Sequence, residues 1–148
     1  MRYAFWPGCV SKGGAPELYP TATSVAEKVG MELVELDQAT CTGAGALGEH
    51  NPKLVDVLNA RTFALAEREG LDTLLTICST CQGVMSAVNY RLREQPEYLA
   101  EINEVLREEG LEYKGTLRIT HMMWALVEEV GIDHLKTMVL RPLRGVKI

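Results

Sequence analysis

The chain has 148 residues, of which 47% are hydrophobic and 24% are charged, the composition of an ordinary globular domain with one core. Its formal net charge of −5 gives no electrostatic argument for binding nucleic acid or an acidic membrane surface. No apolar run approaches the roughly 20 residues of a membrane span, and the N-terminus "MRYAFWPGCV" is too short and interrupted for a signal peptide. We therefore expect a cytoplasmic protein.

The first part of the chain alternates predicted strands with a predicted helix. Residues 2–6, "RYAFW", form an apolar run that ends at Pro7 and Gly8, which indicates a strand followed by a turn. A helix is predicted over 16–30, where prolines suit the first turns and a glycine suits the end. The alternating stretch "MELVEL", 31–36, predicts a second strand.

The strongest helix signal in the sequence covers residues 51–70. Asn51 can cap this helix, Pro52 suits its first position and Gly70 suits its end. The apolar run "DTLLTIC", 72–78, is typical of a strand buried in a parallel sheet. This order, a long helix and then a buried strand, continues the alternation of the first part.

The second half of the chain predicts more helices around one further strand. Helices are expected over 79–94 and 97–110, separated by Pro96, and the stretch 122–131 predicts another. Residues 117–120, "LRIT", predict a fourth strand. Strands joined by helices favour an α/β fold, with a parallel sheet of about four strands and helices on both faces.

Four cysteines follow the ends of three predicted strands: Cys9, Cys41, Cys78 and Cys81. In an open parallel sheet, ligands bind at the carboxyl ends of the strands, so we expect all four cysteines at one edge of the domain. In a reducing compartment such a set favours metal or redox chemistry over disulfides. Cys78 alone, at the end of an apolar strand, would be more typical of the core.

The segment "CSTC", from Cys78 to Cys81, is a C-x-x-C motif at the start of a helix and suits thiol–disulfide exchange or metal binding. An exchange site would need these two cysteines only and would leave Cys9 and Cys41 unexplained. Four convergent thiolates suit tetrahedral zinc or an iron–sulfur cluster. The residues therefore leave open an iron–sulfur domain, a structural zinc domain and a dithiol oxidoreductase that uses Cys78 and Cys81.

His121 follows the fourth predicted strand toward the same edge. A single histidine at such a position is more often a hydrogen-bonded wall residue than a metal ligand, so the ligand set contains cysteines only. Met122, Met123 and Trp124 are predicted to belong to the core of the helix that follows.

The cysteine motifs resemble the cysteine-rich CCG domain family. "YAFWPGC" ends on Cys9, "LVELDQATCTG" carries Cys41 where the family has Cys-Cys-Gly, and "TICSTC" ends on Cys81. These segments look like the N-terminal domain of the cysteine-rich subunit of heterodisulfide reductase. Similar domains occur in iron–sulfur subunits of glycolate oxidase and anaerobic glycerol-3-phosphate dehydrogenase. The likeness covers nearly the whole chain.

The resemblance implies an electron-transfer domain of an oxidoreductase subunit, with a flavoprotein or ferredoxin-like subunit as partner. The implied ligands of its iron–sulfur cluster are Cys9, Cys41, Cys78 and Cys81. In the family, five cysteines hold an unusual noncubane cluster, but Thr42 stands here in place of the second cysteine of Cys-Cys-Gly. A hydroxyl is a poor ligand for such iron, so we expect a four-sulfur 4Fe-4S cluster, with zinc as the alternative.

The family usually carries two such domains in tandem. We expect residues 1–140 to form one CCG-type domain and residues 141–148 to be a linker into a second domain that this chain lacks. One half alone would expose the surface against which the other docks, so we expect a homodimer and no activity from this piece by itself.

Overall fold

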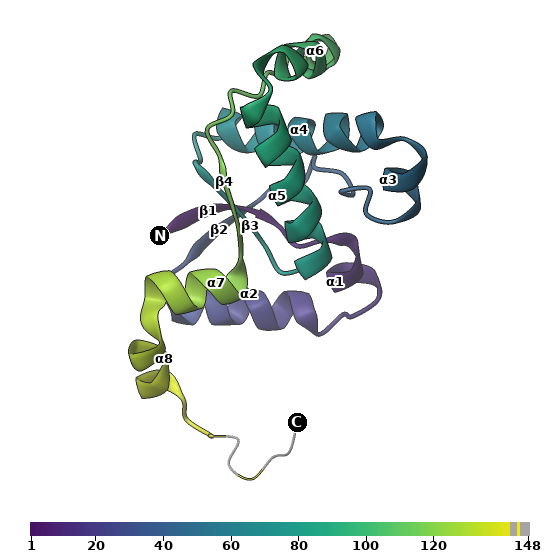
Figure 1. Cartoon of the computed structure of the whole chain (residues 1–148). Helices are drawn as coiled ribbons and strands as arrows, with labels where there is room; N and C mark the ends of the chain where they lie inside the picture. The colour runs from purple at the N-terminus through teal and green to yellow at the C-terminus, as the bar shows by residue number, and fades with distance from the viewer. Residues whose placement is uncertain (143–144, 146–148) are drawn as a thin grey trace.

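The centre of the molecule is a sheet of four parallel strands in the order β2-β1-β3-β4 (Figure 1). The computed structural model describes residues 1–142 and residue 145. The strands are β1 (Arg2–Trp6), β2 (Glu32–Glu35), β3 (Thr73–Thr76) and β4 (Arg118–His121). All four run in one direction, so their carboxyl ends meet at one edge. The predicted α/β fold with a four-stranded parallel sheet is confirmed.

Helices fill the connections between the strands and continue after the last one. They are α1 (Cys9–Gly13), α2 (Leu18–Lys28), α3 (Ala46–His50), α4 (Pro52–Arg68), α5 (Ser79–Glu94), α6 (Pro96–Leu106), the 3-10 turn η1 (Arg107–Glu109), α7 (Met122–Ala125), the π-helical segment η2 (Leu126–Gly131) and α8 (Ile132–Met138). As predicted, Asn51 caps α4, because its side chain accepts a hydrogen bond from the Leu54 N–H.

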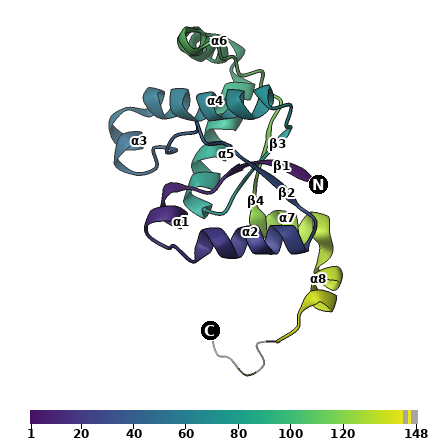
Figure 2. The same cartoon turned by 180° about the vertical axis from the view of Figure 1, so that it is seen from behind.

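Both faces of the sheet are covered by helices, as Figures 1 and 2 show. Successive residues of a strand point to opposite faces. Ala4 and Leu74 therefore belong to the core under α4, α5 and α6, while Phe5 and Leu75 belong to the core under α2 and α7. The central strand β3 is buried along its whole length, which explains its continuous apolar sequence.

The structure differs from the predicted elements in three short helices and one helix face. Helices α1 and α3 have five residues each and lie in segments with no helical apolar pattern. Helix α8 lies beyond the predicted range 122–131. The prediction that Met123 and Trp124 are core residues is wrong, since they are 61% and 56% exposed, whereas Met122 is buried. Helix α7 has four residues, and of these only Met122 and Ala125 are buried in the core.

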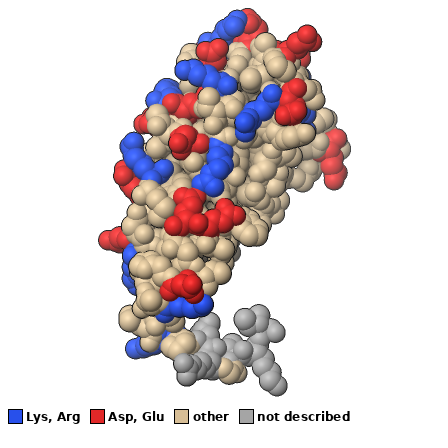
Figure 3. Space-filling view, turned by 60° about the vertical axis from the view of Figure 1, so that its left-hand side comes forward, with Lys and Arg blue, Asp and Glu red and all other residues tan. Residues whose placement is uncertain are grey.

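Acidic and basic side chains are interspersed on the face shown in Figure 3. Along the described ranges 1–142 and 145, each helix is either too short or too polar to cross a membrane. The predicted linker, residues 141–148, lies largely outside the described residues, so the linker and the second domain stay predictions.

Candidate functional site

The structure brings the three cysteine-bearing segments to the carboxyl edge of the sheet. Cys9 begins α1 directly after β1, Cys41 lies in the loop after β2, Cys78 is the cap residue of α5, and Cys81 lies in its first turn. In Figures 1 and 2, α1, α3 and the start of α5 lie on the same side of the molecule. The four cysteine residues therefore lie at the predicted edge, the carboxyl ends of the strands.

Gly8 brings the end of β1 against the C-x-x-C motif. Its backbone has φ 84° and ψ 150°, a region that essentially only glycine adopts. A Cβ at this position would lie 3.1 Å from the Cβ of Cys78 and 3.5 Å from the Sγ of Cys81. A side chain at Gly8 would therefore meet both cysteines of the C-x-x-C motif, so the close approach of this backbone requires glycine.

Thr42 brings the loop after β2 against the same cysteine pair. The residue is 1% exposed, and its hydroxyl donates a hydrogen bond to the Sγ of Cys81 over 3.6 Å. The amide of Asn59 on α4 fixes this loop by donating to the carbonyl oxygens of Thr42, at 2.9 Å, and Val55, at 2.8 Å. Segments 39 residues apart in sequence thus meet at one sulfur.

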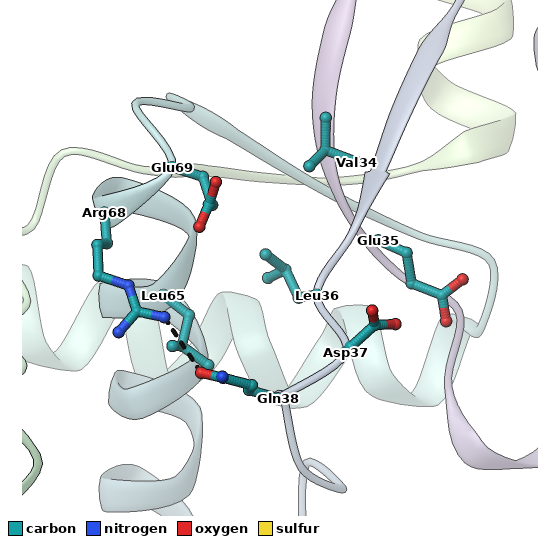
Figure 4. Close-up of a pocket in the computed structure, with 8 residues that line it drawn as sticks. All are labelled: Val34, Glu35, Leu36, Asp37, Gln38, Leu65, Arg68 and Glu69. Atoms are coloured by element: carbon teal, nitrogen blue, oxygen red, sulfur yellow. Dashed lines mark hydrogen bonds between the residues drawn. The ribbon is translucent and has the colours of Figure 1, made fainter.

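Helix α4 also holds the start of this loop. Arg61 Nη1 donates to the backbone oxygen of Gln38 at 2.6 Å, and Arg68 Nη2 donates to its side-chain oxygen at 3.1 Å. Figure 4 shows the second of these bonds beside a pocket of about 250 Å³ between the end of β2 and the end of α4. The pocket is lined by neither cysteine nor histidine. The pocket is therefore separate from the thiols of the four cysteines.

The four thiols have different surroundings. Cys81 is buried, Cys78 is half-buried, and Cys9 and Cys41 are exposed. Burial raises the pKa of Cys81 to about 11; the nearby Cys78 and Cys41 add to this rise, whereas the Thr42 hydrogen bond opposes it. Within residues 1–142 and 145, no three His, Cys, Asp or Glu side chains are grouped closely enough to hold a metal ion. The structure brings the three segments together without drawing all four sulfurs onto one point.

Buried polar atoms without hydrogen-bond partners surround the same edge. In the described part of the chain they are Trp6 Nε1, Thr40 Oγ1, Asn59 Oδ1 and His121 Nε2. Trp6 and His121 end their strands, and both are in register with Thr76 between them. A buried polar atom without a partner costs about 1–3 kcal/mol. A sulfur-containing group at this edge would offer acceptors to donors such as the Trp6 N–H, so these surroundings fit an iron–sulfur cluster.

His121 has a structural role. Its Nδ1 accepts a hydrogen bond from the backbone N–H of Met123 at 3.1 Å, which caps α7. The prediction of a hydrogen-bonded wall residue is confirmed in this respect. Sequence reasoning missed Asn59, although one signal for it was present: it lies four residues after Val55, so a polar side chain occurs on the apolar face of a helix.

Comparison with known proteins places the chain among cysteine-rich proteins. A family model described as "Cysteine-rich domain", CCG, matches residues 3–86. The chain is 33% identical, over 147 residues, to the 8-methylmenaquinol:fumarate reductase membrane anchor subunit of Wolinella succinogenes; the match covers 99% of this chain and 50% of that protein.

Two further relatives have names that refer to heterodisulfide reductase. The chain is 31% identical, over 143 residues, to a subunit of the ferredoxin/F420H2-dependent CoB-CoM heterodisulfide reductase of Methanosarcina acetivorans, a match that covers 96% of this chain and 47% of that protein. It is 28% identical to a protein of Archaeoglobus profundus described as similar to the same heterodisulfide reductase subunit, across all of this chain and 50% of that protein. The chain spans about half the length of these relatives.

A solved structure supports the fold. The crystal structure of a hypothetical protein from Helicobacter pylori matches with a TM-score of 0.67 and 20% identity, over 84% of this chain and 25% of that one. The family model matches more than half of the chain, and its match contains all four cysteines. The chain therefore belongs to the CCG family of cysteine-rich domains, which is related to oxidoreductase subunits.

Proposed function

We propose that this chain is an electron-transfer domain that binds one iron–sulfur cluster of the 4Fe-4S type through Cys9, Cys41, Cys78 and Cys81. The observation that carries the proposal is the meeting of three strand-end segments on one cysteine pair. A Cβ at Gly8 would lie against Cys78 and Cys81, and Thr42 donates to Cys81. Four thiolates from such a convergence are the usual ligand set of a 4Fe-4S cluster.

The chain supplies fixed and adjustable ligands to this site. Cys78 and Cys81 are held on α5, and their thiols form the inner part of the site. Cys9 and Cys41 have exposed side chains that can rotate toward a group seated on that pair. When bound, the cluster takes up and releases single electrons. The absence of a side chain at Gly8 would leave the backbone N–H groups beside Cys78 and Cys81 free to donate to cluster sulfurs.

The names of the relatives support a role within a larger redox complex. They are subunits of reductases for a heterodisulfide and for fumarate. We propose that this domain relays electrons between a flavoprotein or ferredoxin-like subunit and an acceptor, beside a second domain of the same family. Homodimers of the isolated chain and its cytoplasmic location belong to the same proposal.

The two other functions left open by the sequence fit the site less well. A dithiol oxidoreductase needs an accessible thiolate pair, but Cys81 is only 6% exposed and lies behind Thr42. A structural zinc ion would use the same four cysteines, yet it offers no sulfide acceptors to the buried donors at this edge. Metal analysis separates the three functions.

The decisive experiment is anaerobic reconstitution with iron and sulfide, followed by iron, sulfide and zinc counts and electron paramagnetic resonance spectra. We expect about four iron and four sulfide per chain, and loss of the cluster in Cys9→Ser and Cys81→Ser. The control is Ser79→Ala, at an exposed position between the two cysteines of α5, which should load like the parent. Zinc without sulfide would support the zinc domain, and a reversible disulfide between Cys78 and Cys81 without metal would support the oxidoreductase.

A further inference from the structure

The Thr42 hydroxyl is fixed against a sulfur atom by contacts on both sides of the residue. Asn59 holds its carbonyl group. The next residue, Gly43, has φ 73°, and a Cβ there would lie 2.8 Å from Cγ2 of Val55 on α4. The chain therefore passes so close to α4 that Thr42 has little room to move. Its neighbour Cys41 is exposed while Thr42 is 1% exposed, so it is the threonine whose side chain points inward.

The chemistry of this inward position is that of a donor and not of a ligand. A hydroxyl is a poor ligand for the iron of a sulfur cluster, but it donates one hydrogen bond readily. Its acceptor here is the Sγ of Cys81, at 3.6 Å and away from solvent. Hydrogen bonds to ligand sulfurs, together with burial, set the reduction potential of a cluster.

We infer that Thr42 is a positioning residue that raises the reduction potential of the group bound by Cys81, by donating its hydroxyl hydrogen to that sulfur. The inference rests on the proposed cluster. One electron enters the bound group on reduction, no bond breaks, and the proton stays on the Thr42 oxygen. The added negative charge is shared with the sulfur ligands, so a donor to Cys81 stabilises the reduced form more than the oxidised form.

The test compares Thr42→Val, which keeps the shape and removes the hydroxyl, with Thr42→Ser, which keeps the hydroxyl. In redox titrations of the reconstituted proteins, we expect the ratio of reduced to oxidised Thr42→Val to fall on the order of tenfold at a fixed potential, equivalent to ~59 mV for one electron. Thr42→Ser should titrate close to the parent. Electron–nuclear double resonance of the parent, refolded and reconstituted in H₂O or ²H₂O, should show an exchangeable proton coupled to the cluster and absent from Thr42→Val.

The outcomes separate this inference from the proposed function. A parent protein that binds no iron overturns both. A cluster in the parent with equal potentials in all three proteins overturns the role of Thr42 and leaves the proposed function standing. If Thr42→Val fails to hold a cluster, the double-resonance measurement is made on the parent and on Thr42→Ser. An exchangeable proton coupled to the cluster in both proteins supports the inference. The absence of such a proton overturns it.

Discussion

Replacing Gly8 by alanine should damage both the fold and the cysteine site. The backbone at this residue has φ 84° and ψ 150°, and a side chain in that region costs about 1–3 kcal/mol. The new Cβ would also lie 3.1 Å from the Cβ of Cys78. That atom is attached to the backbone at the start of α5 and cannot rotate away, so the contact adds about 1–3 kcal/mol of overpacking.

The matched control for this substitution is Gly30→Ala. Gly30 also has a positive φ, 74°, but no atom lies within 4 Å of its ideal Cβ, so the substitution carries backbone strain alone, about 1–2 kcal/mol. Gly8→Ala should therefore lose roughly two to three times as much free energy of unfolding as Gly30→Ala, from a total of about 5–15 kcal/mol.

The assay for this comparison is urea unfolding of the metal-free proteins, with the midpoint and slope fitted for the parent and both variants. After reconstitution, Gly8→Ala should also hold less iron than Gly30→Ala, because relief of the contact moves Cys78 away from residue 8 and its neighbour Cys9. Equal losses of stability and equal iron contents in the two variants would refute the close approach of β1 to the C-x-x-C motif.

Two further substitutions test the surroundings of the site. Asn59→Ala removes the donor to Thr42 and should cost about 1–3 kcal/mol in urea unfolding; a loss under about 0.5 kcal/mol, typical of surface changes, would contradict the anchoring role. Burial alone would raise the pKa of Glu35, but hydrogen bonds from Lys12 and Tyr19 outweigh it and hold the pKa below its usual value. Its contribution to stability is thus present above the ordinary glutamate pKa of about 4.3 and is lost as the pH falls through the lower folded value; Glu35→Gln should flatten this part of the pH profile of unfolding, and an unchanged profile would argue against the pairing.

The parallel sheet and the edge of the site were within reach of sequence reasoning, since both follow from patterns local in the chain. The strand 2–6 and the helix 79–94 have the bounds that their apolar runs and flanking prolines and glycines indicate. Placement of the cysteines then follows from the parallel sheet alone.

The inner surface of the site was not predictable in the same way. The run of small residues after β2 looks like an exposed loop, yet Thr42 is buried because it meets Cys81 on a helix 39 residues away. Its burial depends on tertiary contacts, and one of them comes from Asn59, a residue whose type favours caps and turns. Trp124 is the reverse case, a residue predicted to be buried that is exposed. The sequence of a short helix does not indicate which of its faces an aromatic residue occupies.

The meeting of distant segments at the cysteine edge has a consequence for the order in which the site forms. Cys78 and Cys81 are three positions apart, whereas Cys9 and Cys78 are 69 positions apart. In an unfolded chain, closing the longer loop costs about 3 kcal/mol more than closing the shorter one. An ion captured by the unfolded chain would therefore find only the C-x-x-C pair. In the folded chain β1 pairs with β3, so we expect formation of the sheet to close the long loop and to bring Cys9 to Cys78 and Cys81 before a metal can bind all of them.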